Sequence, residues 1–138
     1  MRALFADSAT FLLALGGAHP AQEQCRELLA AAHAGRIRLH VSVEGLQEVT
    51  FHRLRRTSRE SALAEARALG LACVVHAFDE AVWAEATRLM ERSPVRGRDA
   101  VNAATALLAG FEEIVSPDVD FDGIPGLRRI DPADWSLS

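Results

Sequence analysis

The sequence has no lysine, so all 15 of its positively charged residues are arginine, and with 19 acidic residues its formal net charge is -4. Proteins that bind nucleic acid over a broad surface are usually basic, because lysine and arginine neutralise the phosphates. The net charge therefore argues against a general polyanion binder but leaves room for a local basic site. Such a cluster exists at Arg53, Arg55, Arg56 and Arg59. It is typical of a solvated helix end as much as of a phosphate site.

Cysteine and long apolar runs are also scarce. Cys25 and Cys73 form no Cys-x-x-Cys pattern, which argues against a zinc or redox motif, and we expect both to be buried thiols. No apolar run reaches the roughly 18 residues of a membrane span. The first residues, "MRALFADS", lack the long apolar segment of a secretory signal. We therefore expect a cytoplasmic protein without a membrane partner.

Short apolar segments alternate with longer segments of helical periodicity. We expect strands at 3–6, 37–41, 71–78 and 112–115, a last short apolar run at 127–130, and helices at 10–17, 21–35, 43–56, 58–69, 80–92 and 98–110. Ser42 and Asp79 are placed to cap two of the helices, and the segment 71–78 has the composition of a buried strand. This alternation predicts an α/β fold, a three-layer sandwich with a parallel sheet.

Acidic residues follow two of the expected strands. Asp7 comes directly after the first strand and Asp118 shortly after the fourth, so both should lie at the same edge of a parallel sheet. Asp99 opens the helix that leads into the fourth strand, and Glu48 lies one helical turn after Glu44. Taken singly, each has an ordinary explanation as a helix-start, turn or solvated residue.

Carboxylates gathered in one partly dry crevice repel one another and are costly to desolvate. At about 5 Å each pair costs roughly 1 kcal/mol in water, and several times more at a protein-like dielectric. A divalent cation removes that penalty, and Mg²⁺ and Mn²⁺ accept carboxylate oxygens as ligands. The sequence therefore predicts a divalent metal site at this edge of the sheet.

Other hydrolase chemistries have little support. No Ser/His/Asp or Cys/His set is apparent, and we interpret His40 and His76 as core or rim residues. A phosphatase with Asp7 as covalent nucleophile would usually have a second aspartate two residues later, where this chain has Ala9.

Four segments in order resemble the PIN-domain ribonucleases, and specifically the VapC toxins of bacterial toxin–antitoxin pairs: "FADSATFLLAL", "VSVEGLQEVTFHRL", "GRDAVNAATALLAG" and "IVSPDVDFDGIPGLRRIDP". Together with "VHAFDEAVWAEATRLMER" they span nearly the whole chain. The resemblance implies a single PIN domain over 1–138 and a metal-dependent endoribonuclease site made of acidic side chains.

The resemblance also implies the roles of individual acids. The four catalytic positions match Asp7, Glu48, Asp99 and Asp118. Of these, Asp7, Asp99 and Asp118 are the expected ligands of Mg²⁺ or Mn²⁺. Asp120 is the alternative for the fourth position, and we expect Asp122 to shape the following turn.

Further expectations concern binding. Ser8 is placed to orient Asp7 or the scissile phosphate, and Arg53, Arg55 and Arg56 are candidate RNA-binding residues. Ala9 stands where the family often has asparagine or another polar residue, so we expect one supporting hydrogen bond to be absent. The expected partners are an RNA substrate, a cognate antitoxin and a second copy of the chain, the last through the amphipathic segment "RLRRTSRESALAEARAL".

Two alternatives to a toxin remain at this point. One is a non-catalytic PIN-like module that binds RNA or protein, although such a module would normally have lost one or more of the acids. The other is a PIN nuclease with a non-toxin role in RNA processing.

Overall fold

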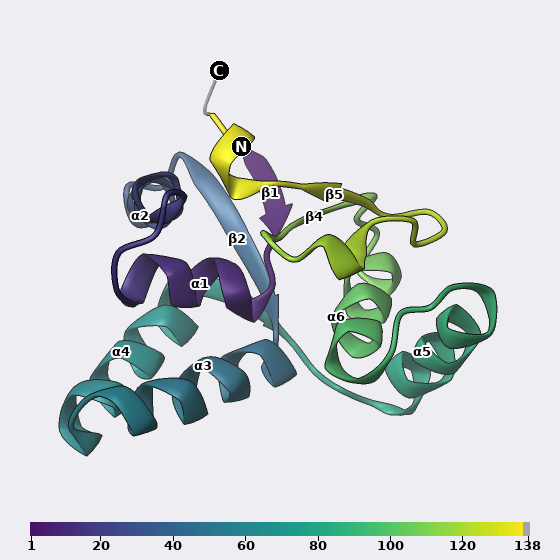
Figure 1. The fold of residues 1–138 in the computed structure, drawn as a ribbon, viewed down its shortest axis with the longest axis horizontal. Helices are drawn as coiled ribbons and strands as arrows, with labels where there is room; N and C mark the ends of the chain where they lie inside the picture. Colours follow the sequence, from purple (N-terminus) through teal and green to yellow (C-terminus); the bar gives the residue numbers. More distant parts are fainter. Residues whose placement is uncertain (137–138) are drawn as a thin grey trace.

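Parallel strands form the centre of the molecule, for which the computed structural model describes residues 1–136 (Figure 1). They are β1 (Arg2–Phe5), β2 (Ile37–Ser42), β3 (Cys73–His76), β4 (Glu113–Val115) and β5 (Arg128–Ile130). One sheet has the order β1-β2-β3, and β4 pairs with β5. Ala6 bridges Val115, and the Asp7 backbone N–H donates to the Val115 carbonyl at 3.2 Å. The strands therefore follow one another as β5-β4-β1-β2-β3, and the carboxyl ends of β1 and β4 lie side by side.

Helices connect these strands. They are α1 (Ser8–Leu15), α2 (Gln22–His33), α3 (Val43–Arg56), α4 (Arg59–Ala72), α5 (Glu80–Arg92) and α6 (Gly97–Leu108), with short 3-10 helices η1 (Val119–Phe121) and η2 (Pro132–Asp134). Side-chain caps at the starts of four helices come from Asp7, Ser42, Ser58 and Asp79. The expected caps at Ser42 and Asp79 are thus confirmed. Within residues 1–136 no helix is both long enough and apolar enough to cross a membrane.

Side chains alternate between two cores, one on each face of the sheet. Leu39 and Val41 of β2 contribute to a core that includes Phe11 of α1 and Leu28 of α2. Phe5 of β1 contributes to the other core, which is built largely from α5 and α6. In Figure 1, α1 to α4 lie on one side of the strands and α5 and α6 on the other. The expected α/β sandwich with a parallel sheet is confirmed.

The segment 71–78 is not the buried strand that its sequence indicates. α4 continues to Ala72, so β3 has only four residues. The side chains of Leu71, Val75 and Phe78 are 90%, 40% and 44% exposed. Val75 is exposed because β3 pairs only with β2 and lies at the edge of the sheet, whereas Leu71 lies at the end of α4 and Phe78 follows the strand.

Two smaller differences concern α1 and the cysteines. α1 begins at Ser8 rather than at Thr10, because Asp7 accepts the Thr10 backbone N–H and so caps an earlier first turn. Cys25 is buried as expected, whereas Cys73 is only partly buried on the edge strand.

We expect Leu39→Ala to lower the free energy of unfolding by about 2–5 kcal/mol, because a leucine in a close-packed core leaves a cavity when truncated. Leu39 is fully buried, whereas Leu108, at the end of α6, is 50% exposed and offers a matched control. Leu108→Ala should cost under about 1 kcal/mol. Urea denaturation measures both variants, and equal losses would contradict the interior position of β2 between β1 and β3.

Candidate active site

Asp7 lies at the junction of β1 and α1, and its carboxylate is almost fully enclosed at 3% exposure. Oδ1 accepts the backbone N–H and the hydroxyl of Thr10 at 3.2 and 3.1 Å. Oδ2 accepts the hydroxyl of Ser116, just after β4, at 2.8 Å. The pKa of Asp7 is raised to about 7, chiefly by desolvation. The negative charge of Asp99 adds to this increase, and the hydrogen bonds from Ser116 and Thr10 oppose it. Asp7 therefore ties two strands together and holds a proton more tightly than an ordinary carboxyl.

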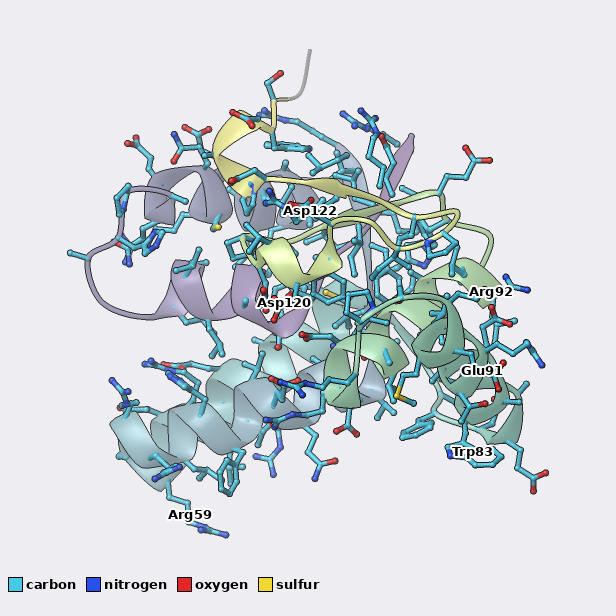
Figure 2. All side chains as sticks on the ribbon, turned by 45° about the vertical axis from the view of Figure 1, so that its right-hand side comes forward. Arg59, Trp83, Glu91, Arg92, Asp120 and Asp122 are labelled. Carbon is cyan, nitrogen blue, oxygen red and sulfur yellow. The ribbon has the colours of Figure 1, made fainter. Side chains whose placement is uncertain are left out.

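Three other acids meet beside the carboxyl end of β4. Asp99, Asp118 and Asp120 each offer a carboxylate oxygen, and the three oxygens lie within 4.8 Å of one another. Asp99 belongs to the first turn of α6. Asp118 caps η1 by accepting the Asp120 backbone N–H at 2.9 Å, and its own backbone N–H donates to the Ser116 hydroxyl at 3.0 Å. Figure 2 shows Asp120 over the middle of the molecule and Asp122 towards β5.

The mutual repulsion of these acids is visible in Asp99. Burial, together with the negative charges of Asp118, Asp120 and Glu48, raises the pKa of Asp99 to about 6, while Arg98 opposes the increase. All the candidate ligands are oxygens, the donor type that Mg²⁺ and Mn²⁺ prefer. Donor type and mutual repulsion thus both fit a divalent cation.

Glu48 is the helical glutamate that faces the acids. Its Oε2 accepts the Ser8 hydroxyl at 3.0 Å, and its Oε1 lies 3.8 Å from Nε of Arg98. The negative charge of Glu48 helps to raise the pKa of Asp99. We expected Ser8 to orient Asp7 or a phosphate, whereas its hydroxyl donates to Glu48. The hydroxyl therefore links α1 to α3 at the edge of the site.

The structure separates the predicted arginines. Arg53 donates from Nε to Glu65 at 2.8 Å, with a side chain only 12% exposed, and so joins α3 to α4. Arg55 and Arg56 instead line a hollow beside Glu48. Arg53 is thus engaged within the fold, whereas the other two face the site.

Two positioning residues were not predicted from the sequence. Thr10 holds Asp7 and lies three residues after it, the spacing of a cap, which is a usable signal. Asn102, 2% exposed, accepts the Ser42 hydroxyl and so ties α6 to the start of α3. Asn102 follows Asp99 by one helical turn, but only the tertiary structure shows that Ser42 meets it.

Two hollows lie beside the acidic residues. One, of about 430 Å³, is lined by Asp99, Asp120 and Arg96, and the other, of about 460 Å³, extends from Glu48 along α3. A hollow of about 920 Å³ lies at the opposite end of β1, beside Phe111, away from these acids. The grouped carboxylates, rather than the volume of the hollow, therefore identify the candidate site.

Comparisons with known proteins identify a family and several relatives. The family model for the PIN domain matches residues 5–127. Ribonuclease VapC7 of Mycobacterium tuberculosis (strain ATCC 25618 / H37Rv) is 32% identical over 130 residues, which cover 91% of this chain and 89% of that protein.

Solved structures share the fold at lower identity. The DNA-bound VapBC of Salmonella typhimurium has a TM-score of 0.75 at 20% identity, over 96% of this chain and 99% of that one. VapC20 of Mycobacterium tuberculosis, a toxin that cleaves the sarcin-ricin loop, has a TM-score of 0.68 at 19% identity, over 91% and 98%.

We expect Asp99→Asn to gain stability relative to the parent as pH rises in EDTA. The folded parent keeps a proton on Asp99 up to a pKa of about 6, while the unfolded chain releases it near 3.8, so the Asp99 contribution to stability falls between these values. Asparagine does not titrate and avoids that loss. Urea denaturation at about pH 4, 5, 6 and 7 measures the difference in the free energy of unfolding between the variant and the parent. Added Mn²⁺ should reverse the sign of that difference. A pH-independent difference would contradict the placement of Asp99 among the acids.

Proposed function

The chain belongs to the PIN-domain family, and from that membership and its grouped acids we propose that it is a metal-dependent endoribonuclease, the toxin of a toxin–antitoxin pair. The observation that carries the proposal is the meeting of three carboxylates within 4.8 Å beside the buried Asp7. The 32% identity to Ribonuclease VapC7, over most of both chains, supports RNA as the substrate.

The proposed metal ligands are Asp7, Asp99 and Asp118, with Mg²⁺ or Mn²⁺ as the cation. Asp120 joins this set because its carboxylate lies in the same cluster as Asp99 and Asp118. When bound, such a cation lowers the pKa of a coordinated water and neutralises charge on the phosphate. Ser116 supports this arrangement, since its hydroxyl donates to Asp7 and accepts from the Asp118 backbone.

The remaining side chains supply orientation and proton transfer. In this proposal Glu48 orients the attacking water and takes its proton, and Ser8 fixes the Glu48 carboxylate by a hydrogen bond. Water attacks phosphorus, the bond to the leaving oxygen breaks, and that oxygen takes up a proton from solvent. Arg55 and Arg56 lie where they can pair with neighbouring phosphates.

The proposed biological setting is cytoplasmic, with an antitoxin protein as partner. It is supported by solved neighbours that are toxin–antitoxin complexes, including one from Klebsiella pneumoniae with a TM-score of 0.72. We also infer that the whole chain acts as a single PIN domain, since the family model covers all but short segments at its two ends.

We expect Asp99→Asn, Asp118→Asn and Asp7→Asn each to lower kcat/KM for RNA cleavage by more than roughly 100-fold, because each removes a charge that holds the cation. Asp120→Asn should cost about tenfold, since Asp120 is exposed. Asp122→Asn is the matched control, because Asp122 pairs with Arg129 outside the cluster. The assay follows RNA cleavage with Mg²⁺, Mn²⁺ or EDTA. Full activity of Asp99→Asn, or cleavage that persists in EDTA, would refute the mechanism.

The proposal includes a homodimer. Large exposed apolar side chains lie at the end of α4 and along the edge strand, at Leu71, Val75 and Phe78, rather than along α4 itself. Such an edge invites pairing, and exposed apolar patches often mark interfaces. We expect light scattering at micromolar concentration to give a dimer mass, and Val75→Asp to shift it towards the monomer. A strictly monomeric parent would exclude this assembly.

A further inference from the structure

A basic hollow of about 460 Å³ begins at Glu48 and follows α3 away from the acids. Its α3 lining includes Phe51, His52, Arg55 and Arg56, and Arg98 of α6 closes the side next to Asp99. Glu48 and Arg55 are seven residues apart on the helix, which places them roughly 10 Å apart along its axis. The hollow therefore extends from the candidate catalytic centre in one direction.

Phe51 is unusual within this hollow because its side chain is 61% exposed. The Arg55 guanidinium lies over the ring, 5.6 Å from its centroid. An exposed aromatic ring beside an arginine plane is the surface on which proteins stack unpaired bases. Among the described residues, the Arg55 guanidinium is the cation that packs on this ring.

The charge of the hollow suits a phosphate backbone. Arg55, Arg56 and Arg98 contribute three positive charges against the single carboxylate of Glu48. Arg98 is 64% exposed and 3.8 Å from Glu48, so its guanidinium keeps donors free for another partner. His52 adds a buried Nδ1 without a hydrogen-bond partner in the described part of the chain. An acidic peptide would match the arginines, but it would not account for the exposed ring beside Glu48.

We propose that this hollow binds an unpaired RNA nucleotide next to the cleaved bond, with its base stacked on Phe51 and the adjoining phosphate held by Arg98. The inference rests on the proposed ribonuclease function and adds a recognition element to it. It assigns the enzyme a requirement for a single-stranded or looped segment on the Glu48 side of the cleavage site.

The test measures binding without cleavage. A fluorescein-labelled single-stranded RNA is titrated with the full chain in EDTA, and fluorescence anisotropy gives Kd. Phe51→Ala and Phe51→Leu should raise Kd about fivefold or more, whereas Phe51→Trp, which keeps a stacking surface, should retain affinity. Arg98→Gln should reduce the slope of log Kd against log salt by about 1. RNA containing 5-iodouridine should crosslink to the α3 peptide that carries Phe51.

Trp83→Leu is the matched control, because Trp83 is 60% exposed on α5 (Figure 2) and does not line the hollow. Its Kd should equal that of the parent, with light scattering used to check the mass of every variant. If the parent binds RNA and Phe51→Ala binds it with the same Kd, this inference is overturned, while the proposed function is not. Loss of antitoxin binding by Phe51→Ala without loss of RNA binding would overturn it in favour of a protein occupant. A parent that neither binds nor cleaves RNA would overturn the proposed function as well.

Discussion

The hydrogen bonds around Asp7 hold the candidate site together. The Ser116 hydroxyl donates to Asp7 and accepts the Asp118 backbone N–H, and Asp118 in turn accepts the Asp120 backbone N–H. This chain of contacts joins β1 to the segment after β4, although Asp7 and Ser116 are 109 positions apart. These contacts add to the Ala6–Val115 bridge and to the hydrogen bonds that the Asp7 backbone N–H and the Thr10 hydroxyl donate to the Val115 carbonyl, and together they fix the carboxylates after β4 relative to β1.

Burying these acids close together imposes an electrostatic cost. Burial raises the pKa of Asp7 to about 7, and burial together with neighbouring acids raises the pKa of Asp99 to about 6. A fold selected only for stability would avoid such a group of acids. The chain instead supports it with hydroxyl donors and with the Ser42 to Asn102 contact, which fixes α3 against α6. The strain is thus confined to one edge of the sheet, where a bound cation would relieve it.

The arginines show how one sequence cluster can divide into different roles. Arg53 is held by Glu65 and stabilises the packing of α3 on α4. Arg55 turns to the other side of the helix, over Phe51 and into the hollow beside Glu48. Arg98 joins that hollow from α6, so the basic surface beside the acids is assembled from segments that are distant in the sequence.

The sequence by itself determined the alternation of strands and helices, the caps at Ser42 and Asp79, and the presence of acids after the first and fourth strands, because these depend on local periodicity and on residues within one turn. The tertiary structure alone decided the exposure of 71–78, since an edge strand and a central strand can share one composition. It also decided that Asp120 joins Asp99 and Asp118, and that Ser8 contacts Glu48. Those relations depend on how separate elements pack, and the spacing of residues along the chain carries no record of the distances between elements.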